Sequence, residues 1–308
     1  MQRVVLGRTG LSVSNLGLGA GGDSRLGQQQ DEAAAVRLVR AALSDGINFI
    51  DTAEAYGTEG VIGQALSEVP RDQVVISTKK KTFGDEQVEP EHVVRSLEDS
   101  LRRLRTDYVD IYHLHGVRPE HYADLRDRLL PSLIKLQEQG KVRFLGITEA
   151  FAADPEHLML QQALADDLWD VVMVGFNLLN QTARERVFPL TIKKEVGTLI
   201  MFAVRRALSR PERLHELLED LARRGKIEPA TAQAGLGFLI HDSGAVSLTD
   251  AAYRFCRVEP GAHVVLSGTG NLSHLRENVR SFHQPPLPER DRARLIEQFR
   301  RVADVSGH

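Results

Sequence analysis

The sequence is short of the residues that would place it among disulfide-bonded, metal-binding or membrane proteins. Cys256 is the only cysteine in 308 residues. The chain can therefore form no intramolecular disulfide and no cysteine-based metal cluster, as expected in a reducing compartment. No segment approaches the ~20 apolar residues of a membrane span, and the first residues lack the roughly 7–15-residue apolar run of a signal peptide. We expect a cytoplasmic protein that does not bind membranes.

An excess of either charge is also missing. The 39 Lys and Arg residues against 42 Asp and Glu give a formal net charge of -3. This balance predicts no basic surface for nucleic acid, so the expected partner is a small molecule. Hydrophobic residues make up 42% of the chain, which is ample for a large core. Cys256 lies in an apolar helical context and is expected to be an inert core residue rather than a nucleophile.

What the sequence has is an alternation of apolar strands and amphipathic helices along its whole length. Eight strands, each followed by a helix, fit a closed parallel barrel better than an open sheet. We predict one α/β domain over residues 1–308. Its fold would be a (β/α)8 TIM barrel with an amino-terminal hairpin before Leu16 and an extra carboxyl-terminal helix over Pro288–Val305. The predicted strands are Leu16–Gly19, the residues leading to Asp51, Val74–Ser77, Tyr108–His115, Val142–Ile147, Val171–Phe176, Gly197–Ala203 and His263–Leu266.

The predicted helices alternate with these strands. Asp31 is expected to cap the first of them, and Gly46 to end it. The others are Gly57–Leu66, Pro90–Leu104, Pro131–Gln139, Pro155–Ala165, Arg184–Lys194, Leu248–Phe255 and Leu272–Phe282.

One connection is longer than a minimal barrel needs. Arg205–Gly237 follows the seventh predicted strand and contains a charged helix over Pro211–Arg224. Connections of this length are usually functional or mobile, and this one emerges at the carboxyl ends of the strands. We predict a lid over substrate or cofactor that supplies most of the substrate wall. A solvated decoration without ligand contact is the alternative.

The run Gly17-Leu18-Gly19-Ala20-Gly21-Gly22 matches the spacing of a dinucleotide fingerprint. That fingerprint requires the glycines to lead directly into a helix whose amino terminus meets the pyrophosphate. Here the next helix is predicted near Asp31, and Asp23 would stand where phosphate is needed. We therefore predict that these glycines allow close backbone packing at the barrel rim.

Three successive predicted strands end in chemically useful side chains. Asp51 ends the second strand and has Tyr56 on its loop, Lys79 ends the third, and His115 ends the fourth. Neighbouring strands of a parallel barrel bring such residues together at its carboxyl end, where ligands bind. Taken singly, each has a structural explanation, as a helix cap, rim packing, a solvated lysine or a core histidine. Their occurrence together favours a functional site over four separate structural roles.

The chemistry of this set is general acid/base catalysis on a carbonyl and its alcohol. A phenol has an ordinary pKa of about 10, and an adjacent ammonium favours the phenolate. Lys79 is expected to bring Tyr56 into a useful range, with Asp51 pairing the lysine. Tyr56 would then protonate a carbonyl oxygen that His115 orients. No hydrolase motif and no cluster with metal-ligand spacing occurs, so no metal site is predicted. A lyase or isomerase using Lys79 as a Schiff base is an alternative.

Four segments match a known family: Leu6–Leu11, Gly46–Ala53 with Tyr56-Gly57, Asp107–Tyr112 with Leu114-His115, and Gly140–Ile147. They resemble the aldo-keto reductases, and the resemblance covers almost the whole chain. It implies the barrel fold and NAD(P)(H)-dependent interconversion of an aldehyde or ketone, sugars included, and its alcohol. It implies a catalytic tetrad on Asp51, Tyr56, Lys79 and His115, with Tyr56 as proton donor. A cofactor-binding regulatory or scaffold subunit with little turnover is the alternative.

The same resemblance implies a nicotinamide cofactor near the carboxyl end. After the last predicted strand, a glycine turn and a helix start can form an anion site from backbone N–H groups and the helix dipole. NADP(H) is preferred over NAD(H) because Arg276 and Arg280 lie nearby as phosphate partners. The implied contacts in this segment are Gly268, Thr269, Gly270, His274, Glu277 and Asn278.

The nicotinamide side departs from the family pattern. The family usually has Ser-Asn after strand five, where this chain has Thr148-Glu149, and a glutamine where this chain has Met173. Phe202 is the best match for the stacking aromatic after strand seven. We count all four residues as cofactor contacts, with Glu149 accepting from the carboxamide or facing substrate or solvent. Substrate, reaction direction and oligomeric state stay open.

Overall fold

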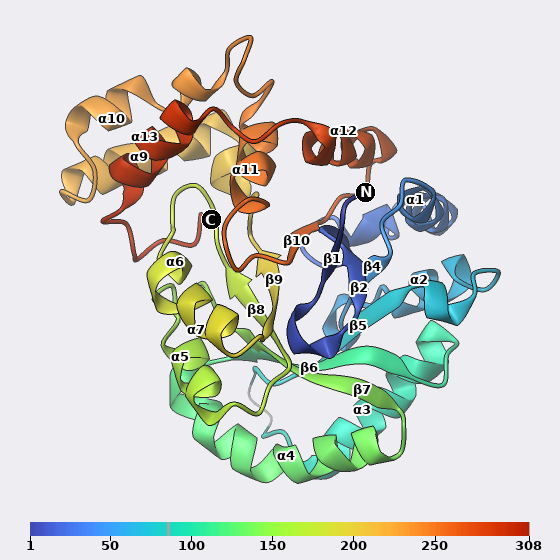
Figure 1. The fold of residues 1–308 in the computed structure, drawn as a ribbon. Helices are drawn as coiled ribbons and strands as arrows, with labels where there is room; N and C mark the ends of the chain where they lie inside the picture. The colour runs from blue at the N-terminus through green and yellow to red at the C-terminus, as the bar shows by residue number, and fades with distance from the viewer. Residues whose placement is uncertain (85–86, 308) are drawn as a thin grey trace.

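The computed structural model describes residues 1–84 and 87–307. Eight parallel strands close into a barrel in the order β10-β3-β4-β5-β6-β7-β8-β9, and helices surround it (Figure 1). The predicted (β/α)8 barrel is confirmed. The barrel strands are β3 (Leu16–Gly19), β4 (Phe49–Asp51), β5 (Val75–Lys81), β6 (Val109–Val117), β7 (Val142–Glu149), β8 (Val171–Gly175), β9 (Gly197–Met201) and β10 (Val264–Ser267).

The helices bury the outward-facing side chains of the strands, because successive strand residues point to opposite faces of the sheet. A large apolar layer fills the space between barrel and helices, and a smaller one fills the barrel itself. The helices are α1 (Glu32–Ser44), α2 (Glu59–Ala65), α3 (Pro90–Leu104), α4 (Tyr122–Glu138), α5 (Leu158–Asp166), α6 (Ala183–Arg186), α7 (Phe188–Lys193), α8 (Arg206–Ser209), α9 (Pro211–Arg223), α10 (Pro229–Ala234), α11 (Leu248–Cys256), α12 (Leu272–His283) and α13 (Glu289–Phe299).

The amino-terminal hairpin closes one end of the barrel. Its strands, β1 (Arg3–Val5) and β2 (Ser12–Ser14), pair antiparallel. Leu6 and Leu11, in the turn between them, pack in the same apolar cluster as residues inside the barrel. Leu6 also lies against Gly197, the first residue of β9. The hairpin therefore covers the amino-terminal ends of the strands, and the carboxyl-terminal ends are left for a ligand.

The first helix begins where the sequence predicts. The Asp31 side chain accepts from the Ala34 N–H at 2.9 Å, and the chain leaves the helix through Gly46 at a φ of +88°. Upstream, a Cβ on Gly17 would lie 2.8 Å from both Leu266 and Val264. The Gly17–Gly22 run therefore serves close packing rather than leading into a helix.

Two helix predictions need correction. The helix α4 begins at Tyr122, so Pro131, predicted as its first residue, lies in its interior. Leu125, Leu129 and Leu133 form one buried stripe that continues across the proline, and their burial offsets the ~3 kcal/mol that an internal proline costs. The predicted helix Arg184–Lys194 is two short helices, α6 and α7, interrupted at Val187 before Pro189.

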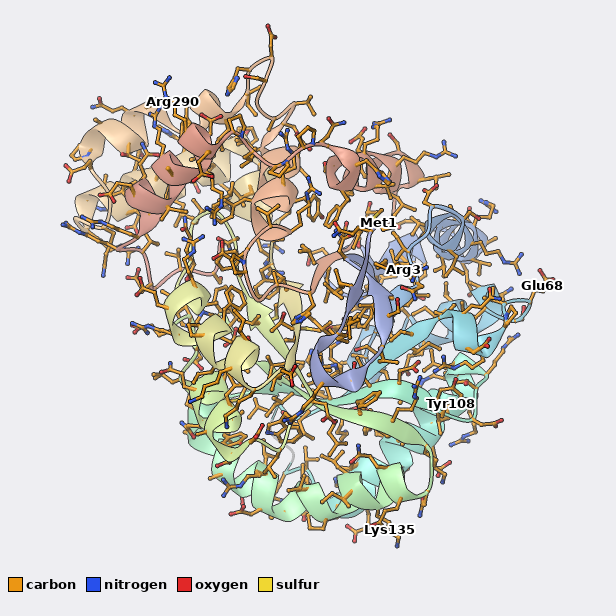
Figure 2. The ribbon with its side chains drawn as sticks, viewed as in Figure 1. Met1, Arg3, Glu68, Tyr108, Lys135 and Arg290 are labelled. Atoms are coloured by element: carbon orange, nitrogen blue, oxygen red, sulfur yellow. The ribbon has the colours of Figure 1, made fainter. Side chains whose placement is uncertain are left out.

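The helices α9 and α10 form a group with the carboxyl-terminal helix α13 at one side of the molecule (Figure 1). The helix α9 packs against α8 and α10, and Leu218 and Phe299 belong to the same apolar layer. Figure 2 shows Arg290, on α13, at the outside of this group and Lys135, on α4, at the opposite end. The predicted extra helix is confirmed, although it ends at Phe299.

Cys256 is buried, and burial raises the pKa of its thiol, so it remains a protonated core residue. In the part of the chain that the structure describes, no helix is long and apolar enough to cross a membrane.

Candidate active site

Three neighbouring strands supply the polar side chains at the centre of the site. Asp51 on β4 lies in register with Ser77 on β5, and Lys79 on β5 with His113 on β6. Because alternate residues of a strand share a face, Ser77 and Lys79 point to the same side of the sheet, as do His113 and His115. The barrel brings these side chains together with Asp51 on its inner side.

Lys79 and Asp51 form a buried ion pair. The Lys79 Nζ donates to Asp51 Oδ2 and to the Thr52 carbonyl oxygen, both at 2.6 Å, and its side chain has no solvent exposure. Burial raises the pKa of Asp51, although the lysine charge opposes the rise. The ammonium lies 5.0 Å from the centroid of the Tyr56 ring. The pair thus holds a positive charge beside the phenol.

Tyr56 and His115 face each other at the cavity wall. Tyr56 ends a short 3-10 helix (Glu54–Tyr56) that follows β4. Its hydroxyl lies 3.3 Å from His115 Nε2, with the two rings edge to face. A Cβ on Gly21 would lie 2.6 Å from the Tyr56 ring, so the loop after β3 uses a glycine to make room for the phenol. The four predicted catalytic residues are brought together.

Burial sets the protonation of this pair. It raises the pKa of Tyr56 above its ordinary value of about 10, although the Lys79 charge opposes it. Burial together with the Lys79 charge lowers the pKa of His115 to about 3. A phenol and a neutral imidazole therefore face each other at neutral pH. The expectation that Lys79 would lower the Tyr56 pKa into a useful range was wrong, because desolvation outweighs the ammonium.

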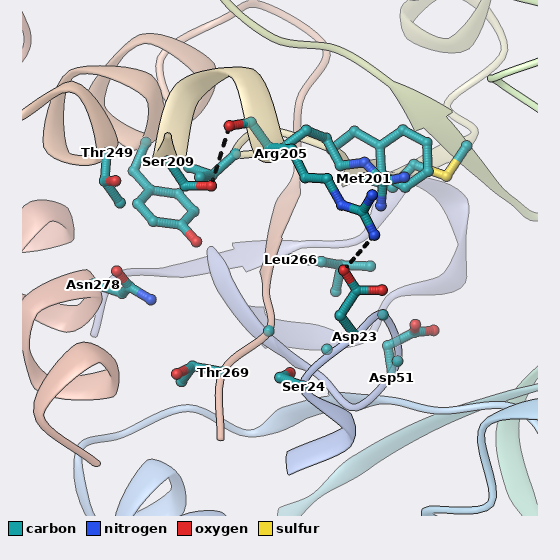
Figure 3. Close-up of a pocket in the computed structure, with 18 of the residues that line it drawn as sticks. Asp23, Ser24, Asp51, Met201, Arg205, Ser209, Thr249, Leu266, Thr269 and Asn278 are labelled. Atoms are coloured by element: carbon teal, nitrogen blue, oxygen red, sulfur yellow. Dashed lines mark hydrogen bonds and ion pairs between the residues drawn. The ribbon is translucent and has the colours of Figure 1, made fainter. Parts of the chain in front are cut away.

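A cavity of about 1380 Å³ connects this centre with the carboxyl-terminal part of the chain. Figure 3 shows Asn278 and Thr249 at one side of it and Asp51 and Met201 at the other. Tyr56 and His115 also line it, whereas the fully buried Lys79 lies behind its wall. The cavity therefore brings the tetrad and the predicted cofactor segment to one site.

Glu149, a predicted cofactor contact, has buried partners within the protein. Both carboxylate oxygens lie 2.9 Å from His157 Nδ1, and Oε1 also accepts the Gly175 N–H at 2.8 Å. His157 Nε2 lies 2.9 Å from the Thr182 hydroxyl. Glu149 touches the cavity, but these contacts orient its carboxylate toward β8 and the start of α5.

The other three residues predicted on the nicotinamide side also line the cavity. The Thr148 hydroxyl accepts the Gly116 N–H at 2.8 Å, and Met173 adds an apolar surface. Phe202 has a φ of +66°, a conformation that is uncommon for a bulky residue and therefore depends on its surroundings. The guanidinium carbon of Arg205 lies 3.8 Å from the Phe202 ring centroid.

The turn between β10 and α12 forms the other side of the cavity. Asn271 caps α12, and its side chain accepts from the N–H groups of Ser273 and His274. An anion at this helix start would have to compete with that cap. Gly270 packs against Gly27, whose nitrogen a Cβ would approach to 2.7 Å, and it is not among the described residues lining the cavity. The other predicted contacts all line it: Gly268, Thr269, His274, Glu277 and Asn278.

Comparison with known proteins shows to which family this chain belongs. Residues 15–298 match the model of the aldo/keto reductase family. The chain belongs to this family. It is therefore an oxidoreductase that interconverts carbonyl compounds and alcohols with a nicotinamide cofactor.

The relatives of this aldo/keto reductase carry different names, some general and some specific to one activity. A "Probable aldo-keto reductase 1" of Glycine max is 26% identical over the whole of this chain and 91% of that protein. The NADH-specific methylglyoxal reductase of Escherichia coli is 29% identical over 62% of this chain and 63% of that protein. A holo-form aldo-keto reductase structure from Bacillus halodurans has a TM-score of 0.75 and 25% identity, over 97% of this chain and 96% of that one.

Two aromatic residues of this aldo/keto reductase were missed by the sequence analysis. Phe83 lies edge-on to His115 with ring centroids 5.3 Å apart, and a Cβ on Gly116 would lie 2.9 Å from it. Phe151 stacks on His157 at 5.4 Å. Both line the cavity. The glycine directly after His115 was the available signal, since it makes room for a large neighbour.

The long segment of this aldo/keto reductase contributes less to the cavity than predicted. Only its first residues line it, among them Arg206, which forms an ion pair with Asp23 at 2.8 Å. The helices α9 and α10 contribute no lining residue in the described part of the chain. Other loops form the wall of the cavity instead, through Phe83, Arg118 and Phe151. The prediction that residues 205–237 supply most of the substrate wall was therefore wrong.

Proposed function

We propose that this chain reduces an aldehyde or ketone with NADPH and that Tyr56 donates the proton. The observation that carries the proposal is the 3.3 Å contact between the Tyr56 hydroxyl and His115 Nε2 on the cavity wall, backed by the buried Lys79–Asp51 pair. Proton donation requires a protonated phenol, and burial raises the pKa of Tyr56. The site therefore favours the acid form that reduction needs.

The cavity has the features that a nicotinamide cofactor requires. It runs from the tetrad to the β10–α12 turn, and the ring of Phe202 offers a flat surface for stacking. Phe202 and Met173 would hold the nicotinamide end, and Thr269, His274 and Asn278 the adenosine end. A bound nicotinamide supplies the hydride.

The protein's own residues handle the proton. A substrate carbonyl oxygen within reach of both Tyr56 and His115 accepts hydrogen bonds from the phenol and from the imidazole Nε2. When the carbonyl carbon accepts a hydride, the oxygen takes the Tyr56 proton, and the product is an alcohol. The phenolate left on Tyr56 is stabilised by the Lys79 ammonium, which Asp51 keeps in place.

Replacing Tyr56 by phenylalanine tests this assignment. Tyr56→Phe removes the proton donor, so the single-turnover rate of aldehyde reduction should fall at least ~100-fold. The dissociation constant for NADPH, measured by cofactor emission, should stay within about two-fold. Tyr108→Phe, at the outside of the barrel (Figure 2), is the matched control. A Tyr56→Phe protein that reduces an active aldehyde as fast as wild type would show the assignment to be wrong.

The preference for NADP(H) over NAD(H) rests on Arg280. Its side chain lines the cavity on α12, and it has no ion-pair partner within residues 1–84 and 87–307. A guanidinium suits a 2′-phosphate, which NADP has and NAD lacks. Arg280→Ala should weaken NADPH binding about ten-fold or more and leave NADH binding unchanged. Arg276, the other predicted phosphate partner, is not among the described residues that line the cavity, so Arg276→Ala is the control. Equal losses for both cofactors, or none, would contradict the preference.

A further inference from the structure

Behind the Asp51–Lys79 pair lies a second buried polar pair, Ser77 and His113. The Ser77 hydroxyl donates to Asp51 Oδ1 at 2.7 Å, and His113 Nε2 lies 3.1 Å from the same hydroxyl. Both side chains are completely buried. Neither touches the cavity, so neither can contact a substrate directly.

The direction of these hydrogen bonds follows from proton count. A hydroxyl carries one proton, and Ser77 gives its proton to the carboxylate of Asp51. His113 must therefore donate its Nε2 proton to Ser77. Burial and the charges of Lys79 and His115 lower the pKa of His113 well below its ordinary value, although the backbone at Ile147 opposes them. His113 is therefore neutral. The contact with Ser77 places its single proton on Nε2, and Nδ1 has no hydrogen-bond partner among the described residues.

The barrel has a dedicated space for this imidazole. His113 points inward from β6, and a Cβ on Gly146 of β7 would lie 2.2 Å from its Nδ1. No side chain larger than hydrogen fits at position 146 while the ring stays in place. The neighbouring inward residues of β5 and β6, Val75 and Ile111, are apolar. Burying a serine and a histidine here is costly unless they hold another polar group.

Asp51 is the group that they hold. Its Oδ2 accepts from Lys79, which leaves Oδ1 needing a donor, because Asp51 is only 3% exposed. Ser77 is that donor, and His113 fixes the Ser77 hydroxyl by occupying its lone pair. With both oxygens bonded, the carboxylate cannot rotate away from the lysine.

We infer that Ser77 and His113 are positioning residues that hold Asp51, and through it the Lys79 ammonium, at a fixed place beside Tyr56. The inference rests on the proposed role of Tyr56 as proton donor. It extends the catalytic centre by one layer behind the tetrad, from β5 to β6.

Three substitutions test the chain of contacts. Ser77→Ala removes the donor to Asp51, and His113→Leu removes the donor to Ser77 while keeping an apolar side chain in the space. Each should lower the single-turnover rate about ten-fold, with the dissociation constant for NADPH within two-fold of wild type. His113→Gln restores an N–H donor and should recover most of the rate. Wild-type rates in both Ser77→Ala and His113→Leu would overturn the inference.

The pH dependence separates positioning from a structural role. The Lys79 ammonium lowers the pKa of Tyr56 more than the Asp51 charge raises it, so a Lys79 that Ser77→Ala has loosened should let that pKa rise. Reduction requires the phenol and fails as pH rises through that pKa. The basic limb of the Ser77→Ala profile should therefore move to higher pH. A basic limb at the wild-type pH would also contradict the inference.

Thr78→Ala is the matched control on the same strand. The Thr78 hydroxyl donates to Glu59 Oε1 at 2.6 Å on the outer face of β5 and is equally buried. This variant should lose comparable stability in urea unfolding and keep the wild-type rate and pH profile. If Ser77→Ala does not fold, Ser77→Cys, with a weak S–H donor, replaces it under the same expectations.

One readout does not depend on turnover. The ¹⁵N chemical shifts of His113 should show a neutral ring protonated on Nε2 from pH 5 to 8, and they should change in Ser77→Ala. If wild type binds NADPH and reduces no carbonyl while these shifts appear, the proposed function fails and the hydrogen-bond chain stands. A ring that carries its proton on Nδ1 would refute the chain itself.

Discussion

His115 shows how the site's protonation and the stability of the fold are linked. Its folded-state pKa of about 3 is below the ordinary histidine value of about 6.5. Below pH 6.5 the unfolded chain binds a proton there that the folded protein does not bind. The free energy of unfolding should therefore fall as pH drops from 6.5 toward 3, by up to about 1.4 kcal/mol per pH unit from this group.

Urea unfolding of wild type and His115→Asn at pH 7, 5.5 and 4.5 measures this contribution. The variant should lose stability with a shallower slope, because asparagine does not titrate. The other titrating groups are common to both proteins. Identical slopes would mean that His115 takes up its proton in the folded state as readily as in the unfolded state.

Glu149 makes a second prediction at the scale of the residue. Glu149→Ala leaves His157 and the Gly175 N–H without their buried acceptor, which should cost about 3–5 kcal/mol of unfolding free energy. Glu98→Ala breaks the partly exposed pair with Lys141 and should cost less than about 1 kcal/mol. Urea unfolding compares the two. Equal costs would mean that the Glu149 carboxylate does little for the fold.

Among the elements, the loop between β3 and α1 has a direct effect on Tyr56. A Cβ on Gly21 would lie 2.6 Å from two carbons of the Tyr56 ring, so Gly21→Ala must displace the phenol. A displacement near 1 Å is expected to lower the rate of reduction by about 100-fold.

Gly60→Ala is the control for this loop. Its Cβ would meet nothing within 4 Å on α2, and alanine should stabilise that helix by up to about 1 kcal/mol. Aldehyde reduction by both variants, with their melting temperatures, makes the comparison. Full activity in Gly21→Ala would show that the ring position is not critical.

The sequence predicted most elements because their signals are local. The helix α1 begins directly after its cap, Asp31, and α3 begins at Pro90, as a side-chain cap and a first-turn proline indicate. The same rule misplaced α4, because Pro131 lies within a longer leucine stripe. Tertiary burial overrode the local preference there. The break between α6 and α7 was missed for the opposite reason, since the apolar pattern continues through Val187 and Phe188.

At the scale of the whole molecule, two phenylalanines show the difference between a core residue and a residue of the site. Phe299, on α13, is completely buried, whereas Phe83 is 45% exposed at the cavity. Phe299→Ala should cost about 3–5 kcal/mol of unfolding free energy, and Phe83→Ala less than about 1 kcal/mol.

The two substitutions should affect catalysis in the reverse order, with the larger effect in Phe83→Ala. Phe83→Ala is expected to raise KM for an aromatic aldehyde about five-fold, because it removes an apolar wall beside His115, while Phe299→Ala should leave KM unchanged at temperatures where it is folded. Urea unfolding and steady-state kinetics on both variants measure the two effects. A large stability loss in Phe83→Ala would place that residue in the core.

The carboxyl-terminal segment also links distant parts of the chain. Asn180 Nδ2 donates to the Val305 carbonyl oxygen at 2.9 Å, and the Ala207 N–H donates to the Gly307 carbonyl oxygen at 3.2 Å. The long segment after β9 is therefore held at its start by the end of the chain, and its later helices pack with α13. Neither arrangement has a signal in the sequence, since both join residues that lie far apart along the chain.

The sequence by itself determined the barrel and the four residues at its centre, because strand periodicity and strand order decide which side chains share an end of a parallel barrel. Only the tertiary structure decided their protonation and their support. Burial outweighed the lysine in setting the Tyr56 pKa, the Glu149 carboxylate bonded to His157, and Ser77 and His113 met Asp51 across three strands. Desolvation and cross-strand contacts depend on the closed barrel, and no local pattern in the chain encodes them.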